Sequence, residues 1–155
     1  KTQEECKEII DNIKKGYPGL TVWQNKTKAE VAERKYCETW SGRRRYLPEI
    51  VSEDWNQKST AERQALNHLI QGTAADLIKL AMARILDGLS DRPWLKPILQ
   101  IHDELVFVIP KEKLEEAVTF VRSCMEEKPF AEFDIPLIAE AAAGPNFGEM
   151  EELDR

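Results

Sequence analysis

Apolar residues near the start of the chain recur every three or four positions, which predicts an amphipathic helix over residues 3–15. The apolar positions of this helix are Cys6, Ile9, Ile10 and Ile13. The run Gly-Tyr-Pro-Gly at residues 16–19 predicts the end of the helix, because Gly stops helices and Pro cannot continue one. A second helix is expected from about Thr21 to Arg34.

The next segment changes from helical to alternating periodicity. Residues 36–40 alternate, Ser41-Gly42 is a two-residue turn signal, and residues 43–47 return, so a β-hairpin is expected. Pro48 closes the second strand, and residues 49–58 are expected to form an exposed loop.

A long amphipathic helix is expected from Ser59 to about Leu86, because residues 59–62 have the spacing of a capping box. The Gln-Gly-Thr step at 71–73 predicts a kink or a break into two helices. The expected apolar face is Leu66, Ile70, Ala74, Leu77, Ile78, Ala81 and Ile85.

Two apolar, β-branched runs at 97–101 and 105–109 flank His-Asp-Glu at 102–104 and predict a second hairpin. Residues 111–127 predict an amphipathic helix, and residues 135–143 a final strand. The order of elements predicts an α+β fold, in which long helices cover an antiparallel sheet.

Composition narrows the class of protein. Hydrophobic residues make up 42% of the 155 positions and charged residues 32%, which is typical of a globular chain. No apolar run reaches the roughly 20 residues that span a bilayer, so no membrane partner is expected. The three cysteines are widely spaced, which favours a reducing, cytoplasmic setting over a disulfide framework or a zinc site. The chain begins with Lys inside a helical pattern, so we expect it to be cut from a longer protein.

The net charge of −6 is unevenly distributed. Residues 1–50 hold 11 Lys or Arg and 8 Asp or Glu, whereas residues 101–155 hold 5 and 14. A basic end suits phosphate binding and an acidic end suits cation binding, although ordinary surface patterning gives the same picture.

The hairpin tip at His102-Asp103-Glu104 is the first candidate site. Two adjacent carboxylates repel each other, and a hard cation such as Mg²⁺ would offset that repulsion. A solvated turn that happens to be acidic is the alternative.

Two further groups of polar residues are candidate DNA contacts. Arg63, Asn67 and Gln71 follow one another at intervals of four, so they share one helical stripe. Asn and Gln can read a minor groove and Arg can pair with a phosphate, although an exposed polar face is the simpler interpretation. In Gly-Arg-Arg-Arg-Tyr at 42–46, alternation puts Arg43 and Arg45 on one face, which suits phosphate contact or protection of a strand edge.

Together these segments resemble family A DNA polymerases. Gln-Ile-His-Asp-Glu-Leu-Val at 100–106 resembles the family's motif C, and residues 65–76 resemble its long palm helix. Residues 38–48 resemble its Glu-Thr-x-x-Gly-Arg-Arg hairpin, and Gly-Pro-Asn-Phe at 144–147 is similar to a closing Gly-x-Asn-Trp.

The resemblance implies both an architecture and residue roles. Residues 1–35 would be a helical remnant of the fingers, and residues 36–155 the C-terminal part of the palm. Asp103 would bind catalytic Mg²⁺, with Glu104 in support and His102 near the primer end. The minor groove of the primer-template would be contacted by Asn67 and Gln71. The template backbone would be contacted by Arg45 and Arg63. The partners would be primer-template DNA, deoxynucleoside triphosphates and the upstream part of the same polymerase, close to the nucleoid.

The sequence departs from the family pattern in two places. It contains no Asp-Tyr-Ser, the family's other metal motif, and no Arg-x-x-x-Lys helix followed by Tyr-Gly. Two-metal chemistry needs carboxylates on both sides of the ion pair, so this chain alone is expected to bind metal weakly and to be inactive. The alternative is a non-catalytic duplex-DNA-binding or structural domain that keeps the palm fold.

Overall fold

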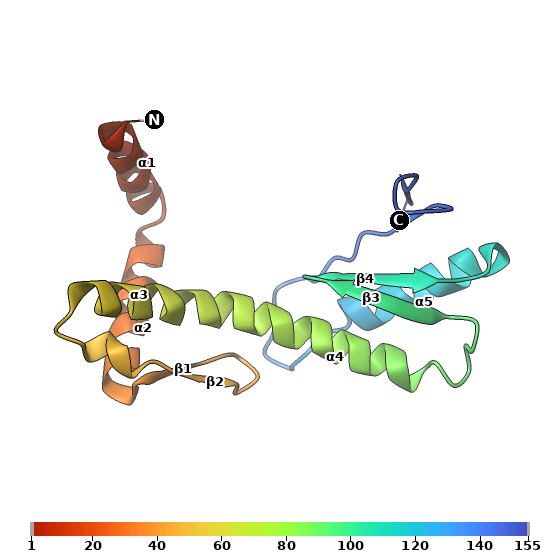
Figure 1. Ribbon diagram of the computed structural model, residues 1–155, viewed down its shortest axis with the longest axis horizontal. Helices are drawn as coiled ribbons and strands as arrows, with labels where there is room; N and C mark the ends of the chain where they lie inside the picture. Colours follow the sequence, from red (N-terminus) through yellow and green to blue (C-terminus); the bar gives the residue numbers. More distant parts are fainter. Residues whose placement is uncertain (1, 155) are drawn as a thin grey trace. The chain divides into compact units, whose positions relative to one another are not determined.

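The computed structural model describes residues 2–154, which divide into two compact units that meet in sequence after Thr73 (Figure 1). The first unit contains α1 (Gln3–Gly16), α2 (Pro18–Arg34), β1 (Tyr36–Glu38), β2 (Arg44–Tyr46), a 3₁₀ turn (Pro48–Val51), α3 (Trp55–Asn67) and a π turn (His68–Gly72). The second contains α4, which starts at the boundary (Thr73–Asp87), β3 (Lys96–Ile101), β4 (Glu104–Val108), a 3₁₀ turn (Lys111–Lys113), α5 (Leu114–Glu126), β5 (Ala142–Ala143) and β6 (Glu151–Glu152).

The predicted α+β class is confirmed. The described residues form three two-stranded antiparallel sheets, each accompanied by helices in its own unit. No helix within residues 2–154 combines the length and apolar character needed to cross a membrane. The division by compactness falls at Thr73, so the assignment of residues 1–35 to fingers and 36–155 to palm stays a prediction.

The first two helices form largely as predicted. Thr2 and Glu5 close a capping box at the start of α1, and the helix ends at Gly16. The predicted start of α2 near Thr21 is wrong, because Pro18 opens the helix instead. A helix-opening Pro loses no hydrogen bond, since the first N–H groups have no partner within the helix.

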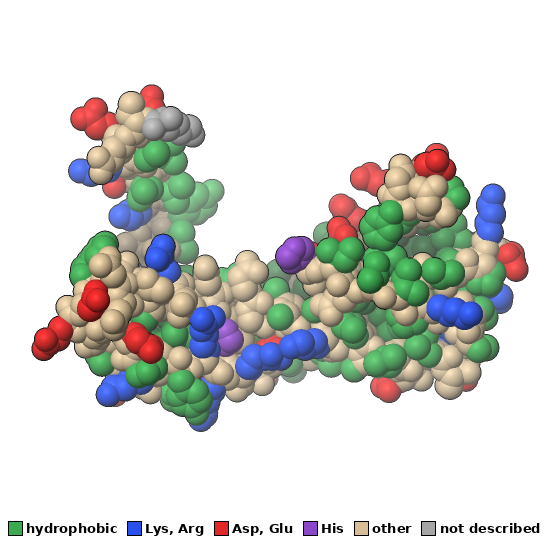
Figure 2. Space-filling model, in the orientation of Figure 1, with side chains coloured by type: hydrophobic (Ala, Val, Ile, Leu, Met, Phe, Trp, Pro, Cys, Tyr) green, Lys and Arg blue, Asp and Glu red, His purple; other side chains and the backbone are tan. Residues whose placement is uncertain are grey.

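The apolar face of α1 is exposed. No residue of this helix is buried, and Ile10 keeps half of its surface accessible to solvent. Figure 2 shows hydrophobic side chains open to solvent along α1. The amphipathic periodicity of residues 3–15 therefore predicted the helix, but it did not predict what packs against its apolar face.

The core of the first unit lies where α2, the first hairpin and α3 meet. Its buried members are Val31, Cys37, Leu47, Ile50, Ala61 and Ala65. The predicted loop at 49–58 is wrong, because a 3₁₀ turn buries Ile50 to 2% exposure.

The predicted start of α3 at Ser59 is also wrong. The helix begins at Trp55, because the Asp54 carboxylate accepts hydrogen bonds from the N–H groups of Asn56 (2.8 Å) and Gln57 (3.4 Å). An Asp at this position satisfies two N–H groups that the first helical turn leaves without partners.

The predicted interruption of the long helix is confirmed. It is the π turn at His68–Gly72, after which α4 begins at Thr73. Ile78, Ala81 and Ile85 are buried in the second unit as expected, whereas Ile70 is 61% exposed.

The second hairpin differs from its prediction at the tip. Ile101 pairs with Glu104, so the loop is His102-Asp103 alone and Glu104 is the first residue of β4. Every residue of β3 is exposed, which leaves apolar side chains of this strand accessible.

The predicted final strand at 135–143 is wrong apart from its last two residues. Ala142 and Ala143 pair with β6, whereas Ile135 and Ile138 are largely exposed. The reason lies in α5: the Glu126 carboxylate accepts from the N–H of Ala139 (2.8 Å), and Arg122 Nε donates to the Ala139 carbonyl (3.2 Å). Side chains of a helix thus take the place of a neighbouring strand.

Candidate functional site

The acidic tip of the second hairpin combines a strained turn with exposed carboxylates. His102 has a φ of 54°, a left-handed conformation that costs most residues free energy. The side-chain amide of Gln100 donates to the His102 carbonyl at 3.2 Å, which supports the turn from β3. His102, Asp103 and Glu104 are all exposed.

The donor set at this tip fits one side of a hard-cation site. Within residues 2–154, neither Asp103 nor Glu104 takes part in an ion pair. Carboxylate oxygens are the ligands that Mg²⁺ prefers. No group of three or more His, Cys, Asp or Glu side chains in the described residues is arranged to hold a metal. The second unit therefore offers one carboxylate pair rather than a complete cage.

The polar stripe on the first unit is exposed along its length. Arg63 and Asn67 lie in α3 and Gln71 in the π turn, and all three side chains are exposed. Arg63 Nη2 approaches the Thr60 hydroxyl at 3.4 Å, which leaves most of its guanidinium accessible. Because Gln71 belongs to the π turn, the spacing of four from Asn67 no longer follows an α-helical surface.

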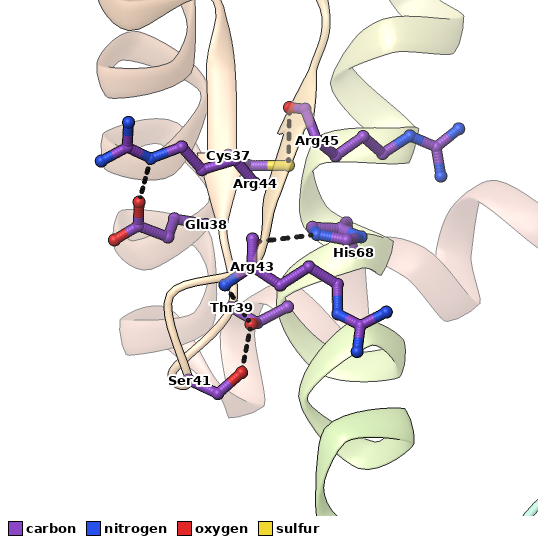
Figure 3. A network of polar contacts seen from close by, with 8 residues as sticks. All are labelled: Cys37, Glu38, Thr39, Ser41, Arg43, Arg44, Arg45 and His68. Carbon is purple, nitrogen blue, oxygen red and sulfur yellow. Dashed lines mark hydrogen bonds and ion pairs between the residues drawn. The ribbon is translucent and has the colours of Figure 1, made fainter. Parts of the chain in front are cut away.

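The β1–β2 hairpin, with its loop at residues 39–43, carries Arg43, Arg44 and Arg45 and is called the arginine hairpin here. Its arginine side chains lie on two sides, as alternation predicts. Arg44 bonds Glu38 and lies over the Tyr36 ring, 4.7 Å from its centroid. The bond to Glu38 raises the pKa of the Arg44 guanidinium above its usual range. Arg43 and Arg45 point to the other side, toward the helix that carries His68 (Figure 3). Arg45 forms no ion pair among residues 2–154, so its guanidinium can accept an external anion.

A buried threonine shapes the loop of this hairpin. Thr39 Oγ1 accepts from the Arg43 N–H at 3.1 Å and lies 3.0 Å from Ser41 Oγ. Gly42 has a φ of 89°, which other residues rarely adopt. These contacts set where Arg43 leaves the loop.

A buried cysteine supports the base of the hairpin. Cys37 is 3% exposed, and its thiol contacts the Arg45 carbonyl at 3.8 Å. Burial raises the pKa of this thiol, which keeps it protonated and makes it a packing residue rather than a nucleophile.

The sequence-predicted residues thus fall into two sets, each within one unit. Arg45, Arg63, Asn67 and Gln71 belong to the first unit, and His102, Asp103 and Glu104 to the second. Sequence reasoning missed the supporting roles of Thr39 and Gln100. The local signal for Thr39 is a threonine two residues before the Ser41-Gly42 turn. The local signal for Gln100 is a glutamine two residues before a turn without glycine.

Comparison with known proteins covers almost the whole chain. The model of DNA polymerase family A matches residues 1–149. The DNA polymerase I of Pseudomonas aeruginosa is 38% identical over 148 residues, which are 95% of this chain and 16% of that protein. The thermostable DNA polymerase I of Thermus filiformis is 36% identical over 154 residues, or 96% of this chain and 18% of that protein. The chain thus spans less than a fifth of these curated relatives.

A solved structure matches as well. It is the POL domain of Pol1 from M. smegmatis in complex with DNA primer-template and dNTP, with a TM-score of 0.80 and 34% identity. The match covers 88% of this chain and 24% of that chain.

Proposed function

Because the chain belongs to DNA polymerase family A, we propose that it is the C-terminal palm portion, with a remnant of the fingers, of a DNA-directed DNA polymerase. The parent enzyme would act on primer-template DNA and deoxynucleoside triphosphates in replication or repair, in the cytoplasm near the nucleoid. The observation that carries the proposal is the exposed Asp103-Glu104 pair on a hairpin tip, in a chain similar to a domain solved with primer-template and dNTP.

The role of the acidic tip follows from its chemistry. Asp103 would hold Mg²⁺ and Glu104 would support it, because both carboxylates are exposed and without ion pairs in the described residues. In the complete enzyme, Mg²⁺ held partly by Asp103 would supply the positive charge that activates the attacking primer oxygen and stabilises the leaving pyrophosphate. His102, whose position Gln100 supports, would lie beside the primer end.

The first unit would hold the duplex. Arg45 and Arg63 would pair with template phosphates, because both guanidinium groups are accessible. Asn67 and Gln71 can each donate and accept, so they would contact base edges in the minor groove, where acceptors are common to all base pairs.

The upstream part of the same polymerase is the proposed partner. Its contact surface would include the exposed apolar side of α1 and the exposed strand β3. Exposed apolar surface of this kind marks sites of association. The chain alone would not polymerise DNA, because Asp103 and Glu104 lie next to each other and cannot clasp two ions from opposite sides.

A second candidate function is duplex-DNA binding without catalysis. The observation in its favour is that the stripe and the arginine hairpin lie in one unit and need no metal. Both candidates predict DNA affinity, and only the first predicts a catalytic role for Asp103.

Primer extension separates the two candidates. The 155-residue chain is compared with a version extended upstream through the missing motifs, each with Mg²⁺ and four deoxynucleotides. We expect extension by the long version only, abolished by Asp103→Ala and retained by Asp134→Ala, an exposed control in the same unit. Full activity of Asp103→Ala in the long version would remove the catalytic assignment.

A further inference from the structure

We propose that the π turn His68–Gly72, together with Thr73, is a cradle that positions the arginine hairpin for phosphate contact. Gly72 and Thr73 are then positioning residues: they hold the backbone from which the side chains of Arg43 and Arg45 extend. The proposal rests on the proposed duplex binding by Arg45. Three contacts within the first unit carry it.

The first contact explains the glycine. A Cβ added at Gly72 would lie 2.7 Å from Thr39 Cγ2 and 3.1 Å from the His68 ring. Thr39 is only 3% exposed, so its methyl group has little room to move aside. A glycine inside a helix is less stable than an alanine, and here the absence of a side chain permits close approach of the hairpin.

The second contact joins two backbones through one hydroxyl. Thr73 Oγ1 accepts a hydrogen bond from the Trp40 N–H at 3.3 Å and donates to the Leu69 carbonyl at 2.7 Å. Trp40 belongs to the hairpin loop and Leu69 to the π turn, so the hydroxyl links the two directly. Valine has the same shape and would remove both bonds, whereas serine would keep them.

The third contact comes from the helix side. His68 Nε2 lies 3.4 Å from the carbonyl of Arg43, and Figure 3 shows its ring beside the chain segment that carries Arg43, just before β2, and Arg45 within it. A carbonyl only accepts, so this nitrogen carries the hydrogen. The contact therefore fixes the backbone at Arg43, the first of the two arginines.

The three contacts hold the end of the hairpin that lies far from its core anchor. The other end is fixed by Leu47, which is buried and whose N–H donates to the Lys35 carbonyl at 2.8 Å. An isolated two-stranded hairpin is marginally stable, so the cradle decides how firmly the loop end is held. An arginine on a fixed backbone loses less conformational freedom on binding a phosphate than an arginine on a mobile loop.

Salt-dependent binding of the full chain to a fluorescent primer-template duplex tests the inference. The variants are Gly72→Ala, with Gly19→Ala as a helical glycine in open space, and Thr73→Val, with Thr73→Ser as the conservative control. We expect Gly72→Ala and Thr73→Val to lower the salt slope by about one, the value of one phosphate contact. Gly19→Ala and Thr73→Ser should match the wild type.

A double mutant identifies the route of the effect. In an Arg43→Ala, Arg45→Ala background, Thr73→Val should change the salt slope no further, because the residue acts through the missing arginines. A lasting additional loss would show that Thr73 acts elsewhere and would overturn the inference.

Amide hydrogen exchange in the free protein keeps the inference separate from DNA binding. Thr73→Val should speed exchange at residues 43–46 while the core amides of Val31 and Ala65 keep wild-type rates. Unchanged exchange and an unchanged slope in folded Thr73→Val would refute the cradle, even where Gly72→Ala fails to fold. Faster exchange in Thr73→Val, together with a wild type that binds no duplex, would instead refute the proposed function and leave the cradle in place.

Discussion

The side-chain amide of Gln100 donates to the carbonyl of His102 across the tip of the β3–β4 hairpin, at 3.2 Å. His102 has a φ of 54° although it is not glycine. The bond therefore supports a conformation that the residue itself disfavours, directly beside Asp103. Strained residues persist where the surroundings hold them and are frequent at functional sites.

Relief of this strain is measurable. His102→Gly should raise the free energy of unfolding by about 0.5–1 kcal/mol, because glycine adopts positive φ without a steric penalty. Lys35→Gly, at a φ of 59° after α2, should do the same. Lys14→Gly, inside α1, is the opposite control and should lower it. Urea unfolding gives the three values, and a loss of stability in His102→Gly would contradict the interpretation.

The acidic tip should bind Mn²⁺ weakly. Paramagnetic broadening in NMR spectra should be strongest at residues 102–104, because Mn²⁺ favours the same oxygen ligands as Mg²⁺. Asp103→Asn should remove this broadening, whereas Asp134→Asn should leave it. Strongest broadening at the acidic C-terminal segment would place the cation elsewhere.

The polar stripe should separate charge from neutral hydrogen bonding. Arg63→Ala should lower the salt slope of duplex binding by about one, as loss of a phosphate contact does. Gln71→Ala should weaken binding by about 1 kcal/mol with little change of slope, as loss of a neutral hydrogen bond does. Lys111→Ala, an exposed charge in the second unit, is the control. Identical slopes for Arg63→Ala and wild type would argue against a phosphate contact.

Arg122 should be a stability determinant without a role in binding. Its guanidinium donates to the carbonyls of Ala139, Leu153 and Asp154 at 3.2–3.3 Å. Arg122→Met keeps most of the side-chain volume and removes these bonds, so it should lower stability by about 1.5–3 kcal/mol. Arg122→Lys should recover part of the loss.

Calorimetry and duplex binding together check this assignment. For Arg122→Met we expect a lower melting temperature in calorimetry and an unchanged salt slope of duplex binding. A changed slope would mean that the clamped C-terminal segment touches DNA.

Local chemistry determined most helices and both hairpins. The Ser41-Gly42 turn gave the first hairpin because Gly42 takes a positive φ, and the apolar period of residues 111–127 gave α5. The Gln-Gly-Thr step marked the interruption of the long helix. The candidate site residues could be placed on a turn or a helical stripe for the same reason, since both are set by neighbours in sequence.

Tertiary structure decided the rest, because it depended on contacts between residues distant in sequence. Residues 135–141 have a strand-like pattern, yet Arg122 and Glu126 occupy the backbone groups of Ala139 that a neighbouring strand would need. The apolar periodicity of residues 3–15 predicted α1, but it did not determine whether other elements would cover the apolar face of this helix. The need for glycine at position 72 comes from Thr39, 33 residues earlier, which only folding brings to the π turn.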